Sequence, residues 1–408
     1  MSLVSGSSDI GLGGSGFVSS LGSFESGSSL KVKRIIISSP RLNATGNSIT
    51  SERIARCLLT SDDSIISVID SKISKELPSD DFDILIAVHA FWSAHLIKCC
   101  RAPIILLLTG TDLNELLIHI PNLKDNDKDE TSTKARISLE SCKRADAIVV
   151  FAKEAKDRFI KVVGDDLGKK VVIIPQAVTL PVDEDSGLEC NILLDSESNN
   201  LRKSVGLRMT DRVLLLVCGL RKVKDPLFLM DAIEEWHKRD STIYLVIVGP
   251  VLEEEMTAEV FRRTSLPNCG LVYSPPISRV CLLRWMKQAD ILVNSSISEG
   301  QSNAILEAFL VSTPVVARKN DGNEALIGKP ETGLRGVLYS TPLECIEACE
   351  KILRKDEIMM QNIQHSLAYV MSEHNSDLER HRWKELVKAT LNNRVIDNRD
   401  INLDFKIN

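Results

Sequence analysis

The chain has 408 residues, of which 43% are hydrophobic and 26% are charged, and its formal net charge is −6 at pH 7. This length and composition are typical of a soluble globular protein with room for two domains of ordinary size. The acidic balance gives no reason to expect a nucleic-acid partner. No stretch approaches the ~18 uninterrupted apolar residues of a membrane-spanning helix, so no transmembrane segment is predicted.

The first 32 residues are rich in glycine and serine. They lack the basic start and the continuous apolar stretch of a secretory signal peptide. We therefore predict that residues 1–32 form a disordered tail. We expect the protein in the cytoplasm and leave unconventional secretion open.

Short apolar runs alternate with amphipathic stretches from Lys33 onward, which predicts a first domain over residues 33–180. Residues 48–59 have helical periodicity and begin with serines that suit a helix N-terminus. The predicted strands of this domain are residues 34–38, 64–69, 83–89, 103–109, 147–152 and 170–176.

The pattern changes over residues 181–208, an acidic and then polar segment that we interpret as a linker. Strand and helix patterns alternate again over residues 209–375, the predicted second domain. Residues 376–408 are expected to form a helix and tail that return to the first domain. In the second domain we predict helices at residues 226–237, 279–289 and from about residue 301, and strands at residues 212–219, 243–249, 271–275, 290–296, 314–318 and 336–340.

Continuous apolar strands separated by helices indicate parallel sheets that are covered on both faces. The predicted fold class is therefore α/β, with two tandem doubly wound Rossmann-like domains that face each other across a cleft. Ligands of such sheets bind at the carboxyl ends of the strands, so the residues that follow each strand are the candidates for a site.

Three strand ends of the first domain carry candidate residues. Gly46 opens a helix whose backbone N–H groups could approach an anion, with an ordinary turn as an equal alternative. The dinucleotide fingerprint G-x-G-x-x-G is absent there. His89 ends an apolar strand, where a structural histidine is the alternative to a functional one. Asp112 follows the next strand and either serves the site or caps the helix after it.

The first strand of the second domain leads into "CGLRKVKDP", residues 218–226, which places Arg221 and Lys224 at a strand end. Two cations in front of a helix suit an anion such as a diphosphate. A solvated basic loop is the alternative interpretation.

The segment "SEGQSNAILEAFL", residues 298–310, places Glu299 at the start of an apolar helix and Glu307 about two turns inside it. Carboxylates are seldom fully buried without a partner, so either Glu307 faces water or a ligand meets these groups. The free N–H groups of Ser302 and Asn303 at the helix start carry a partial positive charge that would also suit a diphosphate.

The cysteines and acidic runs do not form a predicted metal site. None of the ten cysteines forms a CxxC pair, and several lie in apolar segments, so reduced buried thiols are expected. No Asp-x-Asp follows a strand beside the expected diphosphate site, and the "DED" of residues 183–185 lies in the linker.

The segment "SEGQSNAILEAFLVSTPVVA", residues 298–317, resembles the E-x7-E motif of the retaining glycosyltransferases of family 4, also called glycosyl transferases group 1. "CGLRKVKDP" resembles that family's Gly-Arg…Lys segment, and "QADILVNSS" resembles its usual strand entry. The segments "LTGTDLNE", "VIIPQAV" and "RKNDGNEALI" narrow the resemblance to one subgroup. It covers about residues 33–392 and implies the two-domain GT-B architecture. Gln301 and Ser302 depart from the family, whose members often carry an aromatic and a small residue there.

The resemblance implies a role for each candidate residue. Arg221 and Lys224 would neutralise the diphosphate of a nucleotide-sugar donor. Glu307 would accept hydrogen bonds from the ribose hydroxyls, and Glu299 would accept them from the donor sugar. Backbone amides of Ser302 and Asn303 would contact the phosphate or the sugar. The residues expected across the cleft, near the transferred sugar and the acceptor, are His89 and Asp112.

The predicted function is the transfer of a sugar from a nucleotide-diphosphate-sugar donor to an unidentified acceptor. Retention of anomeric configuration, no metal and no separate cofactor are expected from the resemblance. Two alternatives stay open: a nucleotide-sugar-binding protein without turnover, and a sugar-nucleotide epimerase of the same architecture. The donor sugar, its base, the acceptor and the oligomeric state are not predicted.

Overall fold

The computed structural model describes residues 33–40, 46–59, 64–78, 81–124, 128–181, 200–330, 333–354 and 357–392. The predicted tail at residues 1–32, most of the predicted linker and the end of the chain lie outside these described residues.

The first domain is built on a six-stranded parallel sheet with the strand order β2-β1-β3-β4-β5-β6. The central strands are almost completely buried, because helices cover both of their faces. The strands are β1 (Lys33–Ser39), β2 (Ser64–Asp70), β3 (Ile84–Val88), β4 (Ile104–Leu107), β5 (Ala147–Val150) and β6 (Val171–Ile173).

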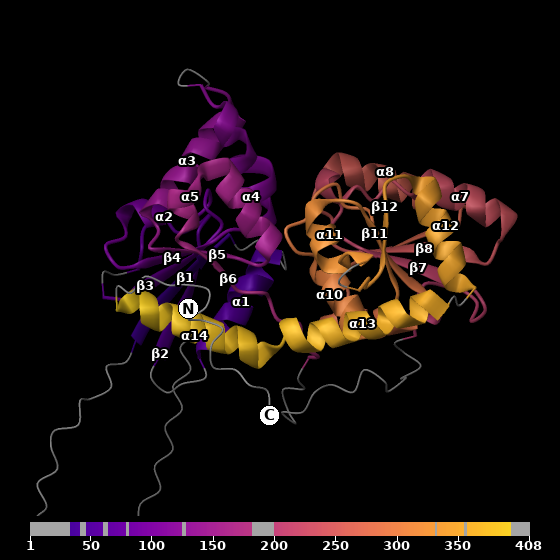
Figure 1. Cartoon of the computed structure of the whole chain (residues 1–408). Coiled ribbons are helices and arrows are strands. Elements are labelled where there is room, and N and C mark those ends of the chain that lie inside the picture. Colours follow the sequence, from indigo (N-terminus) through magenta and orange to yellow (C-terminus); the bar gives the residue numbers. More distant parts are fainter. Residues whose placement is uncertain are drawn as a thin grey trace, which may run out of the picture.

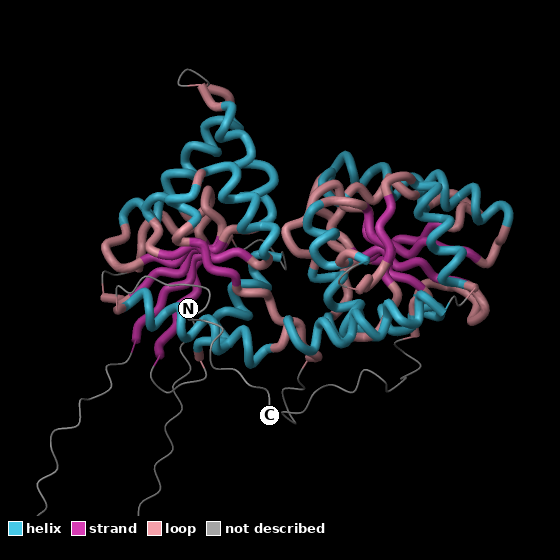
Figure 2. Tube along the Cα trace, viewed as in Figure 1, coloured by secondary structure: helices cyan, strands magenta, loops and turns pink. Residues whose placement is uncertain are grey.

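Two apolar clusters lie on opposite faces of this sheet. One is formed with α1 (Gly46–Leu58) and α14 (Ser376–Leu391), and the other with α2 (Ala94–Cys99), α3 (Glu130–Arg144) and α4 (Lys153–Val163). The remaining helical segments are the π-helix η1 (Asp112–Leu116), the 3-10 helix η2 (Leu117–Asn122) and α5 (Asp165–Gly168). The domain therefore has three layers, with the strands between helices in Figure 2.

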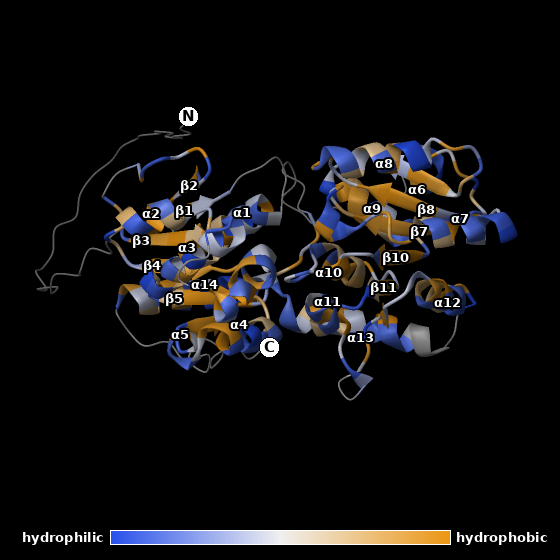
Figure 3. Cartoon of the chain, turned by 90° about the horizontal axis from the view of Figure 1, so that it is seen from above, coloured by the Kyte–Doolittle hydropathy of each residue, from blue (hydrophilic) through white to orange (hydrophobic). Residues whose placement is uncertain are grey.

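The second domain repeats this plan with the strand order β12-β11-β10-β7-β8-β9, again all parallel. Its strands are β7 (Arg212–Val217), β8 (Ile243–Val248), β9 (Leu271–Ser274), β10 (Ile291–Asn294), β11 (Val315–Arg318) and β12 (Val337–Tyr339). In Figure 3 the strands of both domains are the hydrophobic layer, with hydrophilic residues on the surrounding helices.

Helices cover both faces of this second sheet as well. One cluster includes α7 (Met230–Arg239), α8 (Glu254–Thr264) and α12 (Pro342–Leu353). The opposite cluster includes α6 (Leu201–Ser204), α9 (Arg279–Gln288), α10 (Asn303–Leu310), α11 (Asp321–Ile327) and α13 (Glu357–Glu373). A 3-10 turn, η4 (Lys222–Lys224), follows β7.

The predicted fold class of two doubly wound α/β domains is confirmed. Each predicted strand is present, although most are shorter at their carboxyl ends. The helix predicted from Pro226 begins only at Met230, because residues 226–229 form turns. The helix predicted from Gln301 begins at Asn303, with Ser302 as its N-cap.

The C-terminal helices cross from the second domain to the first. In Figure 1, α13 and α14 run one after the other beneath both domains. Helix α13 packs against α10, and α14 packs against α1. No helix in the described part of the chain is long and apolar enough to cross a membrane.

Candidate functional site

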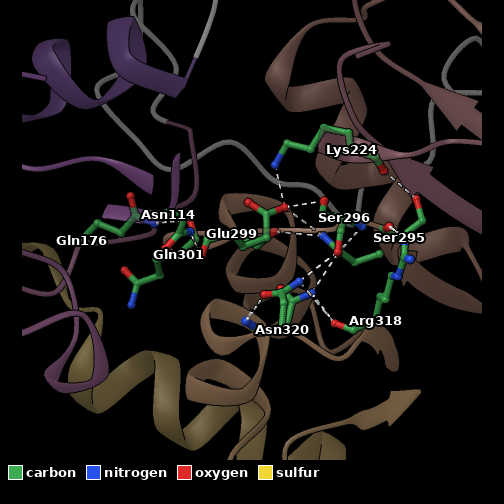
Figure 4. Close-up of polar contacts among 12 residues, drawn as sticks. Asn114, Gln176, Lys224, Ser295, Ser296, Glu299, Gln301, Arg318 and Asn320 are labelled. Carbon is green, nitrogen blue, oxygen red and sulfur yellow. Dashed lines mark hydrogen bonds and ion pairs between the residues drawn. The ribbon is translucent and has the colours of Figure 1, made fainter. Parts of the chain in front are cut away.

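Glu299 lies in the loop between β10 and α10, and its carboxylate is surrounded by hydrogen-bond donors (Figure 4). Its Oε1 accepts a hydrogen bond from Lys224 Nζ at 2.6 Å. The same oxygen accepts from Ser296 Oγ at 2.7 Å and from Asn294 Nδ2 at 3.3 Å. These donors come from the carboxyl end of β10 and from the loop after β7, so Glu299 joins two neighbouring strand ends.

Burial alone would favour the neutral form of Glu299, whose side chain is only 7% exposed. The charge of Lys224 and the hydrogen bonds from Lys224, Ser296 and Asn294 outweigh that burial and hold the pKa of Glu299 below its ordinary value. Glu299 is therefore an ionised carboxylate inside the protein.

Asn294 organises the loop around Glu299. Its Oδ1 accepts hydrogen bonds from the backbone N–H of Ser296 at 3.1 Å and from Asn323 Nδ2 at 3.0 Å. Its backbone carbonyl accepts from the buried Tyr339 hydroxyl at 2.9 Å. Asn320 Nδ2 donates to the carbonyl of Ser296 at 2.9 Å. The end of β10 is thus held by residues from two other segments, the start of α11 and β12.

The basic segment after β7 places its two predicted cations differently. Lys224 is bound to Glu299, as described. The Arg221 guanidinium is partly exposed and has no hydrogen-bond or ion-pair partner among the described residues. Both cations lie within reach of the same group, since each lowers the pKa of the nearby Cys218 thiol against the dominant effect of burial, which raises that pKa. Arg221 is therefore available to an anion at this strand end.

Glu307 does not share the partners of Glu299. Its Oε1 accepts from Arg279 Nε at 2.9 Å, at the start of α9. Burial raises the pKa of Glu307 despite the opposing charge of Arg279. Arg279 also donates to the carbonyl of Thr179, in the segment that leaves the first domain. Arg279 was not predicted as a site residue.

The predicted helix-start residues lie beside Glu299. Ser302 is buried, and its Oγ accepts from Asn294 Nδ2 at 3.4 Å. Asn303 is the first residue of α10. Gly46 is the first residue of α1 and is exposed; the residues before it, 41–45, are not described. A Cβ added to Gly46 would meet nothing within 4 Å, so no close backbone approach requires glycine there.

His89 and Asp112 are brought together inside the first domain. His89 Nδ1 lies 2.9 Å from Asp112 Oδ1, and both side chains are buried. Asp112 accepts from the backbone N–H groups of Ala90 at 2.9 Å and Thr109 at 2.8 Å. Its carboxylate therefore binds the ends of β3 and β4, whereas the N-cap of the following helix is Thr111.

His89 has a backbone conformation that is uncommon for a non-glycine residue. Its φ of 76° lies in the left-handed region, where a side chain costs about 1–2 kcal/mol. Strain of this kind is retained where the surroundings fix the residue, and it is enriched at functional sites. Here the backbone of His89 is fixed by its hydrogen bonds to Leu107 and Ser93, and the Asp112 carboxylate lies beside its ring.

Three described residues of the first domain reach the loop that carries Glu299, and a fourth reaches the adjacent helix α11. Asn114 Nδ2 donates to the carbonyl of Glu299 at 2.9 Å, and Gln176 Nε2 donates to the carbonyl of Gln301 at 3.3 Å. The backbones of Gly110 and Gly300 touch, because a Cβ on Gly110 would lie 2.8 Å from the backbone nitrogen of Gly300. The fourth residue, Arg158, pairs with Asp321 of α11 at 2.5 Å.

Sequence reasoning missed most of the amides in this network. Asn294, Asn320 and Asn323 lie at or just after the ends of β10 and β11, and Asn114 follows β4 of the first domain. Their position at strand ends is the signal that could have identified them. The unpredicted residues that hold or border the site are Asn294, Ser296, Arg318, Asn320, Asn323, Arg279, Asn114 and Arg158.

The arrangement of two Rossmann-like domains with apposed sheet ends is the two-domain GT-B fold. Solved structures support this class: the chain matches the structure of Anabaena Alr3699/HepE in complex with UDP-glucose with a TM-score of 0.68 at 16% identity. The match covers 87% of this chain and 99% of that one.

Residues 211–355 match the model of the family described as glycosyl transferases group 1. The resemblance to glycosyl transferases group 1 that was predicted from the sequence is thereby confirmed for this part of the chain. A relative from Xenopus tropicalis, named glycosyltransferase 1 domain-containing protein 1, is 28% identical over 351 residues, which is 84% of this chain and 94% of the relative. This is the subgroup indicated by the segments that narrowed the resemblance.

A second relative matches over a shorter range. The alpha-monoglucosyldiacylglycerol synthase of Acholeplasma laidlawii is 22% identical over 229 residues, which is 55% of this chain and 53% of that protein.

Proposed function

We propose that this protein is a metal-independent, retaining glycosyltransferase that takes its sugar from a nucleotide-diphosphate-sugar donor and acts in the cytoplasm. The family match and the GT-B neighbours support sugar transfer. The single observation that carries the proposal is the buried, ionised Glu299 bound to Lys224, with the unpaired Arg221 on the same strand end.

In this proposal, the two cations stabilise the leaving diphosphate. In transfer, the bond between the anomeric carbon of the donor sugar and the diphosphate oxygen breaks, and its electron pair moves to the diphosphate. Arg221 and Lys224 would stabilise that charge more strongly in the transition state than in the bound donor. A lysine ammonium has three N–H donors, so Lys224 can keep its bond to Glu299 and still bind a phosphate oxygen.

The two carboxylates would bind the hydroxyls of the donor sugar and of the ribose. Because Glu299 is ionised, it can only accept hydrogen bonds, which suits the hydroxyls of the donor sugar. Arg279 occupies Oε1 of Glu307, so the second carboxylate oxygen would accept hydrogen bonds from the ribose hydroxyls. The N–H groups of Ser302 and Asn303 at the start of α10 would bind the phosphate or the sugar.

The acceptor enters from the first domain in this proposal. Its hydroxyl oxygen forms the new bond to the anomeric carbon on the face that the diphosphate leaves, and its proton passes to the departing diphosphate. The strained His89, which lies beside Asp112, would bind the transferred sugar and the incoming acceptor. The described residues after β3 would give the acceptor its other contacts.

A thermal-shift titration against UDP-, GDP- and ADP-sugars tests the donor site. A ligand at ~100 times its dissociation constant stabilises the native state by about 2.7 kcal/mol, so one base class should raise the unfolding temperature. The Glu307→Ala variant should lose the shift, whereas Glu235→Ala, which removes an exposed carboxylate on α7, should keep it. No shift with any of the three donors would contradict the proposal.

A nucleotide-sugar-binding protein without turnover is the second candidate. The contact between Gly110 and Gly300 favours it, because the two backbones already fill the space where a donor and an acceptor would have to meet. Donor binding without hydrolysis or transfer, over a broad panel of acceptors, would support this candidate. Release of free nucleotide-diphosphate above background would exclude it.

A further inference from the structure

One side chain, Asn114, connects the two halves of the candidate site. It lies in the π-helix η1, together with Asp112. Single π-helical turns are rare and often occur at functional sites. From this one turn, Asp112 binds the ends of β3 and β4 in its own domain, and Asn114 binds the carbonyl of Glu299 in the other.

Both polar atoms of the Asn114 amide form hydrogen bonds, and these bonds fix the orientation of the amide. Oδ1 accepts a hydrogen bond from the Arg158 guanidinium, and Nδ2 donates to the carbonyl of Glu299. A guanidinium only donates and a carbonyl only accepts, so the amide cannot be reversed. An aspartate in this place would keep the arginine and turn an oxygen toward the Glu299 carbonyl.

Arg158 has a second partner in the opposite domain. Its other terminal nitrogen pairs with Asp321 at 2.5 Å, at the first residue of α11, and the Arg158 side chain is 20% exposed. The next residue, Gly322, is packed so closely that a Cβ there would lie 2.3 Å from the Glu299 carbonyl oxygen. The backbone of Glu299 is therefore held between α11 and Asn114.

We propose that Arg158 and Asn114 are positioning residues that hold the two domains together and fix the Glu299 loop for sugar transfer. The inference rests on the proposed function, because it assigns these residues to the assembly of that same site. Neither residue touches the reacting atoms. Their effect passes through the backbone of residues 298–302, and therefore through the carboxylate of Glu299.

Hydrogen exchange and small-angle scattering test the proposal without any need for turnover. In Asn114→Ala and Asn114→Asp, amides of residues 298–302 should exchange at least about tenfold faster, and the radius of gyration should rise. Gly110→Ala provides a separate route to the same result, because its Cβ would collide with the Gly300 backbone while every polar group stays. Lys161→Ala, on the exposed face of α4, is the matched control for Arg158→Ala.

Kinetics then separate positioning from binding. With a donor identified by thermal shift, transfer by Asn114→Asp and Arg158→Ala should fall about 10- to 100-fold, with the donor dissociation constant nearly unchanged. The fraction of donor that is hydrolysed should rise, because a poorly positioned site admits water. Wild-type exchange and scattering in Asn114→Ala, Asn114→Asp and Arg158→Ala would overturn the inference. Faster exchange in a protein that binds no nucleotide-sugar would overturn the proposed transferase and support the domain contact alone.

Discussion

At the scale of single residues, the candidate site depends on a carboxylate that stays charged while buried. The sequence places Glu299, Arg221 and Lys224 after neighbouring strands, and parallel strand ends meet at one edge, so their proximity was predictable. The partner of Glu307 was not, because Arg279 lies 28 residues away and meets it only through the packing of α9 on α10. The amides around Asn294 likewise depend on loop geometry that residue type does not determine.

Replacing Lys224 with methionine should expose the cost of that buried charge. Without its cation, Glu299 keeps only neutral donors, and the loss of one partner of a buried pair costs about 3–5 kcal/mol, here toward the lower end because Lys224 is partly exposed. Urea unfolding of Lys224→Met should show this loss, and the Glu299→Gln/Lys224→Met double variant should recover most of it. Both variants should lack sugar transfer. Equal stability of Lys224→Met and wild type would mean that the pair contributes nothing to the fold.

The sign of the pH dependence follows from the lowered pKa of Glu299. A carboxylate with a folded pKa below its unfolded value stabilises the protein above the unfolded pKa and loses that contribution as the pH falls. Lys224→Met removes the charge that opposes burial, so its loss of stability should be large at neutral pH and should shrink in acid.

At the scale of helices and strands, the regular elements were predictable and the irregular ones were not. Short apolar runs identified the strands, because both faces of a parallel sheet are buried. The π-helix at Asp112 and the 3-10 turn at Lys222 have no characteristic spacing of apolar residues, so no sequence pattern indicates them. These two turns carry Asn114 and Lys224, which are central to the site.

Helix α14 should be essential to the first domain, although it follows the whole second domain in the chain. Trp383 on this helix is fully buried in the cluster formed by α1 and the first sheet. Trp383→Ala should therefore destabilise the first domain by about 3–5 kcal/mol. Limited proteolysis should then cut the first domain before the second. Trp285→Ala, in the core of the second domain, should reverse that order, and identical patterns in both variants would contradict the assignment.

At the scale of the whole molecule, two crossings join the domains, and they are hydrogen-bonded to each other. The first crossing follows β6, and the second lies between α13 and α14. The backbone N–H of Val178 donates to the carbonyl of His374 at 3.0 Å, and His374 Nδ1 donates to the carbonyl of Gln176 at 2.7 Å. Glu379, bound to Arg53, accepts from the backbone of Ala177 at 2.9 Å. These links join segments about 200 residues apart, which no local sequence pattern predicts.

The second crossing should make the stability of the protein sensitive to mild acid. Burial, followed by the nearby charges of Arg335, Arg53 and Arg382, lowers the pKa of His374 from 6.5 to about 4, although its hydrogen bond to Gln176 opposes this. Between these two pKa values, His374 is protonated in the unfolded chain but neutral in the native protein. The free energy of unfolding should therefore fall by about 2 kcal/mol between about pH 7 and about pH 5 from this group alone.

Comparison with His374→Asn isolates that contribution from the other titrating groups. An asparagine nitrogen can replace Nδ1 as donor to the Gln176 carbonyl, but the side chain takes up no proton in this range. Denaturant unfolding at several pH values should give a flatter curve for the variant, with the two proteins converging in stability as the pH falls. Parallel curves would show that His374 does not titrate between the native and unfolded states. A flatter curve would mean that the same crossing that connects the domains also limits their stability in acid.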